Sequence, residues 1–180
     1  MKTVILDCDI ASCLAKINRI DLLWAAFPNF EVYITESVSI ELLRASQAGF
    51  SFPDRIFKSI TVISLNQEER MMLQDMPKNR SIHFGEAEGL ILSKNRSAIF
   101  LTNDSRAVRY CRDSDIKVLD LRDILFLLFM QKALKRDEII DLIRTIEDKD
   151  NIVIKNKSDL LDLMKLDHAG AAPEEPFPQG

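Results

Sequence analysis

The sequence predicts an α/β protein in which helices cover both faces of a central, mostly parallel β-sheet. Short runs of apolar and β-branched residues alternate along the chain with longer segments of helical periodicity, which is the pattern of repeated strand–helix–strand units. The chain of 180 residues is long enough to bury an apolar core in one domain. We therefore expect one domain with its strands at the centre.

Apolar runs bounded by polar or turn residues are the candidate strands, and periodic segments are the candidate helices. Strands are predicted at residues 4–6, 32–34, 60–63, 98–102 and 116–119. Helices are predicted at residues 10–17, 21–27, 36–48, 66–76, 85–95, 105–112, 136–147 and 158–166. The stretch 50–58 contains Pro53 and is predicted to be a loop with at most one turn, and 78–81 is a polar loop.

A further helix begins at Asp120 or Asp123 and holds seven consecutive apolar residues, Ile124 to Met130. A helix without a polar face must be covered on all sides, by the protein's own core or by a second subunit, so a homodimer is a hypothesis. The last residues are rich in Gly, Ala, Pro and Glu, which predicts a disordered tail. We expect a domain at 1–166, with a helical extension from about residue 120, and a tail at 167–180.

The charge balance excludes a globally basic nucleic-acid-binding protein. Lys and Arg number 24 and Asp and Glu number 28, so the net charge is −4 and nucleic acid would require local basic patches. Cys8, Cys13 and Cys111 lack zinc-ligand spacing, which indicates reduced thiols. Asp7 and Asp9 interrupt the apolar N-terminus, so we expect no signal peptide. No apolar run approaches the roughly 20 residues that a membrane span requires, so we expect a cytoplasmic protein without a membrane span.

Acidic residues follow two of the predicted strands. Asp7 and Asp9 come after the first strand, and Asp104 comes after the fourth. Ligands of open parallel sheets bind at the carboxyl ends of the strands, so these acids are expected to face one crevice if both strands are central. Acids at helix starts also serve as caps, and this explanation stays open for Asp7 and Asp9.

Three glutamates extend the acidic set. Glu41 lies among apolar residues of one predicted helix, and Glu86 and Glu88 begin another, where the helix dipole alone favours acids. Residues two apart do not share a helix face, so at most one of this pair points into a site. Converging carboxylates require a countercharge, and oxygen ligands suit Mg²⁺ or Mn²⁺. His83 and His168 are isolated, so no His or Cys cluster indicates another metal.

Four segments, in this order, resemble the PIN domain family, and most closely the small prokaryotic PIN proteins related to VapC-type toxin ribonucleases. The segments are Ile5-Leu6-Asp7-x-Asp9-x-x-Ser12, Val38-x-x-Glu41-Leu42, Gly85-Glu86-Ala87-Glu88 and Leu101-Thr102-Asn103-Asp104-x-x-Ala107. The match spans about residues 3–130, and 121–154 resembles the helical extension of one PIN subgroup. The resemblance implies a three-layer α/β/α sandwich and metal-dependent cleavage of RNA, with an antitoxin-like protein as a partner.

By position, the resemblance assigns the catalytic and metal-binding roles to four acids, Asp7, Glu41, Glu86 and Asp104, with Mg²⁺ or Mn²⁺ as the cofactor. Asp9 stands where the family commonly has Ser, Thr or Asn, and it is a further candidate ligand. Glu88 is the alternative to Glu86, although the family's third acid usually opens its helix. The residues expected to contact RNA are Ser12, Arg44, Asn103, Arg106 and Arg109, with Arg112, Lys78 and Arg80 as further cations. A solvated basic face explains each cation equally well on its own.

Two other functions compete with this interpretation. Asp7-Cys8-Asp9 after a buried strand resembles the motif of haloacid-dehalogenase-type phosphatases, in which Asp7 would be the nucleophile and Asp9 the general acid. That family would leave Glu41 unexplained. A non-catalytic PIN-like module that binds RNA or protein is the second alternative, which the presence of all four acids disfavours.

Overall fold

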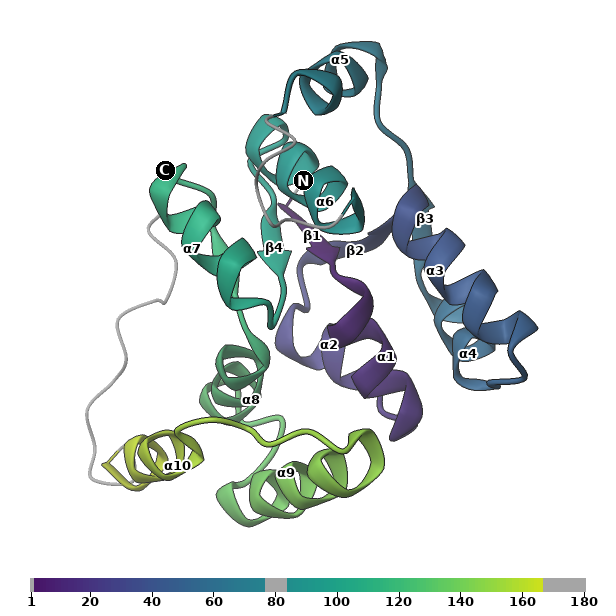
Figure 1. The fold of residues 1–180 in the computed structure, drawn as a ribbon. Coiled ribbons are helices and arrows are strands. Elements are labelled where there is room, and N and C mark those ends of the chain that lie inside the picture. Colours follow the sequence, from purple (N-terminus) through teal and green to yellow (C-terminus); the bar gives the residue numbers. More distant parts are fainter. Residues whose placement is uncertain (1, 77–83, 167–180) are drawn as a thin grey trace.

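The structure is a computed structural model that describes residues 2–76 and 84–166 of the 180. The described residues contain one five-stranded sheet with the order β3-β2-β1-β4-β5 (Figure 1). Its strands are β1 (Lys2–Leu6), β2 (Phe30–Thr35), β3 (Thr61–Ile63), β4 (Ile99–Leu101) and β5 (Val118–Leu119). All four neighbouring pairs are parallel, so the carboxyl ends of the strands meet at one edge.

The pleat of β1 divides the core between the two faces of the sheet. Val4 and Leu6 belong to one buried apolar cluster and Ile5 belongs to the other, as expected for side chains that alternate along a strand. All three side chains are fully buried. A strand covered on both faces reads as a continuous apolar run, which explains the Val-Ile-Leu sequence.

Helices supply the two outer layers. The larger cluster joins the sheet to α1 (Cys8–Lys16), α2 (Asp21–Ala26), α3 (Glu36–Gln47), α4 (Phe52–Ser59), α8 (Leu121–Met130), α9 (Arg136–Asp150) and α10 (Lys157–Leu166). The smaller cluster joins the opposite face to α5 (Gln67–Asp75), α6 (Phe84–Asn95) and α7 (Ser105–Asp113). The predicted three-layer α/β/α architecture with a helical C-terminal extension is confirmed.

The prediction of a loop at 50–58 is wrong, because residues Phe52–Ser59 form α4. Pro53 lies in the first turn of this helix, where a missing N–H breaks no helical hydrogen bond. Ile56 anchors the helix in the core. Helix α9 also continues to Asp150 instead of ending at 147. The predicted loop at 78–81 and the predicted tail at 167–180 lie outside the described residues.

The apolar helix α8 is covered by the protein itself. Asp120 caps it in a capping box with Asp123. The helix packs against α2, α9, α10 and β5, and Leu127, Leu128 and Phe129 are buried within the single chain. The prediction that the protein's own core covers this apolar segment is therefore confirmed. None of the helices in 2–76 and 84–166 combines the length and apolar character that crossing a membrane requires.

Candidate active site

The first candidate residue stands where the order of the strands reverses. Strand β1 has β2 on one side and β4 on the other, so its carboxyl end is the switch point of the sheet, where open α/β folds bind ligands. Asp7 directly follows β1 and remains tied to the sheet, because its N–H donates to the carbonyl of Leu101 over 2.9 Å. Asp104 follows β4 and starts α7. The sequence prediction that both acids lie at one edge agrees with this topology.

Asp7 is a buried carboxyl group, 7% exposed. Its Oδ2 accepts a hydrogen bond of 2.7 Å from the Thr102 hydroxyl, and its Oδ1 accepts one of 2.6 Å from the N–H of Cys8. Burial raises the pKa of Asp7 from 3.8 to about 7; the Thr102 bond opposes this rise, and the charges of Asp9 and Glu86 add to it. Asp7 thus caps α1 and also has a strongly raised pKa. A role as a helix cap alone does not explain the raised pKa.

Thr102 connects Asp7 to Asp104. Its hydroxyl donates to Asp7 and accepts a 3.1 Å hydrogen bond from the Asp104 N–H. The Asp104 carboxylate caps α7, because Oδ1 accepts from the N–H groups of Arg106 at 2.7 Å and Ala107 at 2.9 Å. One buried hydroxyl therefore joins the carboxylate of Asp7 to the backbone of Asp104. The sequence analysis did not assign a role to Thr102, and its only signal is a hydroxyl residue at the end of an apolar strand.

Glu41 reaches the site from α3. Its side chain is exposed, but Oε1 lies over Gly85, where an added Cβ would come within 3.0 Å of it. The same carboxylate adds to the effect of burial in raising the pKa of the Cys8 thiol to about 12. Glu41 therefore lies between the start of α1 and the start of α6. Gly85 was part of the sequence pattern, but its role as the space for Glu41 appears only in the structure.

Glu86 and Glu88 have different environments, although both are buried. The charge of Glu86 contributes to the raised pKa of Asp7. Glu88 Oε2 instead accepts a 2.9 Å hydrogen bond from the N–H of Ser37, in the first turn of α3. Glu88 is thus engaged in joining α6 to α3, and Glu86 is the one that neighbours Asp7.

The remaining predicted residues divide between a nearby cavity and the outer surface. The cavity is lined by Asp9, Ser12, Asn103, Arg109 and Arg112, all from the predicted set. Arg44 and Arg106 are exposed and do not line it. The predicted cations Lys78 and Arg80, together with His83 and His168, lie outside the described residues.

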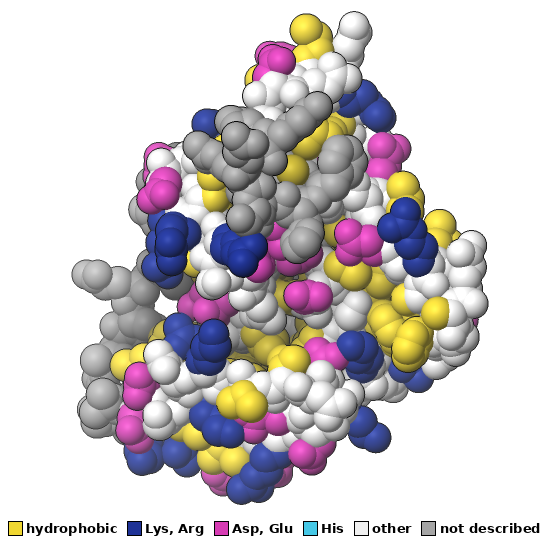
Figure 2. All heavy atoms as spheres, in the orientation of Figure 1, with side chains coloured by type: hydrophobic (Ala, Val, Ile, Leu, Met, Phe, Trp, Pro, Cys, Tyr) yellow, Lys and Arg dark blue, Asp and Glu magenta, His cyan; other side chains and the backbone are white. Residues whose placement is uncertain are grey.

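The chemistry of this acidic edge fits a hard divalent cation. Figure 2 shows Asp and Glu side chains gathered in a hollow at the middle of one face, with Lys and Arg around them. The donors are carboxylate oxygens, since the Cys8 thiol stays protonated at neutral pH. Within 2–76 and 84–166, no group of three or more Asp, Glu, His or Cys side chains stands arranged around one point. The acids border the carboxyl-end edge of the sheet, and their oxygen donors and negative charge suit a divalent cation.

The comparison with family models agrees with the resemblance. A model described as PIN domain matches residues 3–163, which include both acid-bearing strand ends and most of the C-terminal helices. No curated protein matches the chain.

Proposed function

Because the chain belongs to the PIN domain family, whose fold is of the nuclease type, we propose that it is an endoribonuclease that depends on a divalent cation. The proposed ligands of Mg²⁺ or Mn²⁺ are Asp7, Glu41, Glu86 and Asp104. Asp9 is a further candidate, because its charge already acts on Asp7. The reaction is hydrolysis of a phosphodiester bond in RNA.

The observation that carries the proposal is the environment of Asp7. Burial and the charges of Asp9 and Glu86 destabilise the ionised form of this carboxyl group at neutral pH. The two hydrogen bonds of Asp7 in the described structure come from a hydroxyl and a backbone N–H, neither of which is a cation. Strong perturbation by burial and neighbouring charge, at a ligand-binding edge of the sheet, is typical of functional acids.

The proposed chemistry requires positioned carboxylates and no nucleophilic side chain. A divalent ion on these carboxylates would activate a water for in-line attack on phosphorus and stabilise the leaving 3′ oxygen. Thr102 keeps Asp7 and Asp104 in register by bonding to both. The charges of Glu41 and Asp7 act on the Cys8 thiol, and with a pKa of about 12 this thiol is not a nucleophile at neutral pH. Water is therefore the nucleophile in this proposal.

The test is cleavage of a labelled single-stranded RNA in the presence of Mn²⁺ or Mg²⁺. We expect cleavage by the wild type, and none in EDTA or with the Asp7→Asn, Asp104→Asn double variant. The exposed Asp54 on α4 provides the control variant Asp54→Asn, which should cleave like the wild type. Cleavage that survives EDTA and the double variant would refute the proposal. A folded wild type without any cleavage would favour the binding-module alternative, and hydrolysis of small phosphate esters lost with Asp9→Asn would favour the phosphatase.

We also propose that the protein acts in the cytoplasm as the toxin of a toxin–antitoxin pair. The support is the motif resemblance to VapC-type toxins and the three free thiols, Cys8, Cys13 and Cys111. Expression of the wild type should arrest bacterial growth, whereas the double variant should not. A homodimer through the elements that neighbour α8 is a further proposal, since α8 itself is covered by the chain, and a monomeric mass in light scattering would refute it.

A further inference from the structure

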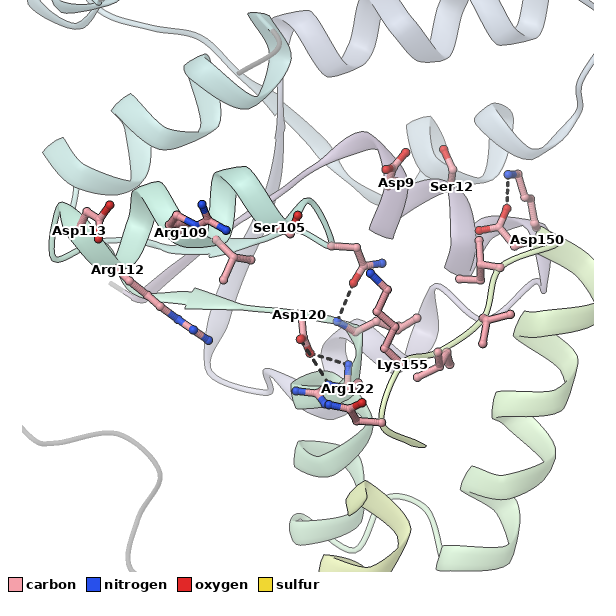
Figure 3. A pocket seen from close by; sticks show the side chains of 18 residues that line it. Asp9, Ser12, Ser105, Arg109, Arg112, Asp113, Asp120, Arg122, Asp150 and Lys155 are labelled. Atoms are coloured by element: carbon pink, nitrogen blue, oxygen red, sulfur yellow. Dashed lines mark hydrogen bonds and ion pairs between the residues drawn. The ribbon is translucent and has the colours of Figure 1, made fainter. Parts of the chain in front are cut away.

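A cavity of about 690 Å³ opens beside the acidic edge. Its walls come from α1, from α7, from the start of α8 and from the segment 152–156, which connects α9 to α10 (Figure 3). Asp9, Asn103 and Ser105 line it, and these residues are sequence neighbours of Asp7 and Asp104, so the cavity adjoins the proposed metal site. This volume lies within the range of pockets that bind drug-sized ligands, roughly 300–1,000 Å³.

The wall contributed by the C-terminal extension is firmly held. An ion pair between Lys16 and Asp150 joins α1 to the end of α9. Beyond this point Ile154 is buried in the core, and its N–H donates to Glu147 Oε1 over 3.0 Å. The Lys157 ammonium binds the same carboxylate at 2.7 Å. The segment that carries Lys155 is thus anchored on both sides.

Three of the cations lining the cavity are exposed and take part in no ion pair within the described residues. They are Arg109 and Arg112 on α7, and Lys155 on the opposite wall. The acids Asp150 and Asp120 are already paired, with Lys16 at one side and with Arg122 at 3.5 Å. Asp9 and Asp113 complete the ionisable lining. Cations on facing walls therefore remain available for a polyanion.

The cavity also contains apolar surface. Val108, Ile152 and Val153 line it, and Val153 is 77% exposed, the largest exposure among the large apolar side chains that the structure describes. An exposed aliphatic side chain beside unpaired cations suits a ligand with an apolar face and a charged backbone. A nucleotide combines these properties, because the base is flat and weakly polar on its faces and the phosphate is anionic.

We propose that this cavity binds single-stranded RNA next to the bond that is cleaved, so that the C-terminal extension forms part of the substrate site. Arg109, Arg112 and Lys155 bind the phosphates, and one base lies against Val153. The proposal rests on the proposed function for its substrate class. It adds that Lys155, far from the acidic motifs in the sequence, determines how strongly RNA is held.

The test is RNA binding measured by fluorescence anisotropy in EDTA, with a labelled single strand of about 12 nucleotides. Lys155→Ala and Arg112→Ala should each weaken binding roughly 3- to 10-fold and lower the salt slope by about 0.7, the value for one lost phosphate contact on a single strand. Lys58→Ala is the matched control, because Lys58 is an exposed lysine on α4 that does not line the cavity. Lys155→Arg should restore binding. Equal affinity and equal salt slope for Lys155→Ala and Lys58→Ala would overturn the proposal, as would a wild type that does not bind RNA.

Kinetics separate this proposal from the proposed function. Lys155→Ala should raise KM for RNA with kcat nearly unchanged, since Lys155 does not contact the reacting atoms. Cleavage with an unchanged KM in Lys155→Ala would overturn the cavity proposal and leave the nuclease intact. RNA binding that depends on Lys155 without any cleavage would support the cavity and refute the nuclease.

Discussion

Replacing Asp7 with Asn should make the metal-free protein more stable at alkaline pH. The folded state raises the pKa of Asp7 from 3.8 to about 7, so between these values it binds more protons than the unfolded state. The free energy of unfolding of the wild type therefore falls as pH rises through this window. A shift of about 3 pKa units at 1.36 kcal/mol each gives a cost of about 4 kcal/mol once Asp7 is fully ionised. Asparagine carries no charge and avoids this cost.

The net gain is smaller, because asparagine accepts from only one of the two present donors. The carboxylate now accepts from Thr102 and from the N–H of Cys8, and changing one of these bonds costs about 1–3 kcal/mol. We expect Asp7→Asn to stabilise the protein by about 2 kcal/mol near pH 8 and to have almost no effect near pH 5.

The assay is urea unfolding of wild type and Asp7→Asn in EDTA at both pH values. The difference in unfolding free energy between the proteins should grow by about 2–3 kcal/mol from the lower to the higher pH. Addition of Mn²⁺ should then stabilise only the wild type. A difference that does not change with pH, or a variant less stable near pH 8, would refute the reasoning about Asp7.

Three further predictions concern residues around the site and the fold. Glu88→Ala should destabilise the protein by about 1–3 kcal/mol in thermal or urea unfolding, because it leaves a buried N–H at the start of α3 without its acceptor; a loss of Mn²⁺ binding at unchanged stability would contradict this role. Gly85→Ala should displace Glu41, whose Oε1 would lie 3.0 Å from the new Cβ, and should weaken Mn²⁺ binding in calorimetry with little change in unfolding midpoint; unaltered binding would show that Glu41 is not needed. The buried Glu69 is bound by Arg96 at 2.7 Å, and this hydrogen bond lowers the pKa of Glu69 from 4.5 to about 2. The contribution of the pair to the free energy of unfolding should therefore fall by about 2–3 kcal/mol as pH falls from near 5 to near 2. In Glu69→Gln this part of the acid sensitivity should be absent, and an identical pH profile in the variant would count against it.

The layers of the fold could be predicted from the sequence because the patterns that indicate strands and helices are local. Alternation between strands and helices predicts a parallel sheet. Asp7 directly follows β1 and Asp104 lies three residues after the end of β4, and the topology places these two strands side by side. The helix α4 was missed because Pro53 was interpreted as a breaker, although proline is favourable in a first helical turn. Rules based on neighbouring residues fail at prolines, because proline begins some helices and ends others.

The parts of the site that sequence reasoning did not find depend on contacts between distant segments. Thr102 matters because its hydroxyl lies between two acids that are far apart in the chain. Lys155 lines the cavity because the C-terminal extension folds back on α1, through an ion pair whose partners are 134 positions apart. No local pattern around residue 155 indicates that neighbourhood. Among the predicted acids, the family resemblance already favoured Glu86 over Glu88, and the structure adds that Glu88 accepts a hydrogen bond from the N–H of Ser37.

The most direct test of the central claim is a Mn²⁺ titration followed by electron paramagnetic resonance. The claim is that Asp7, Glu41, Glu86 and Asp104 together hold a divalent cation. We predict saturable Mn²⁺ binding by the wild type and by the control Asp54→Asn, and strongly weakened binding when any one of the four acids is replaced by its amide. Wild-type binding that persists in all four amide variants, or its absence from the folded wild type, would contradict the claim.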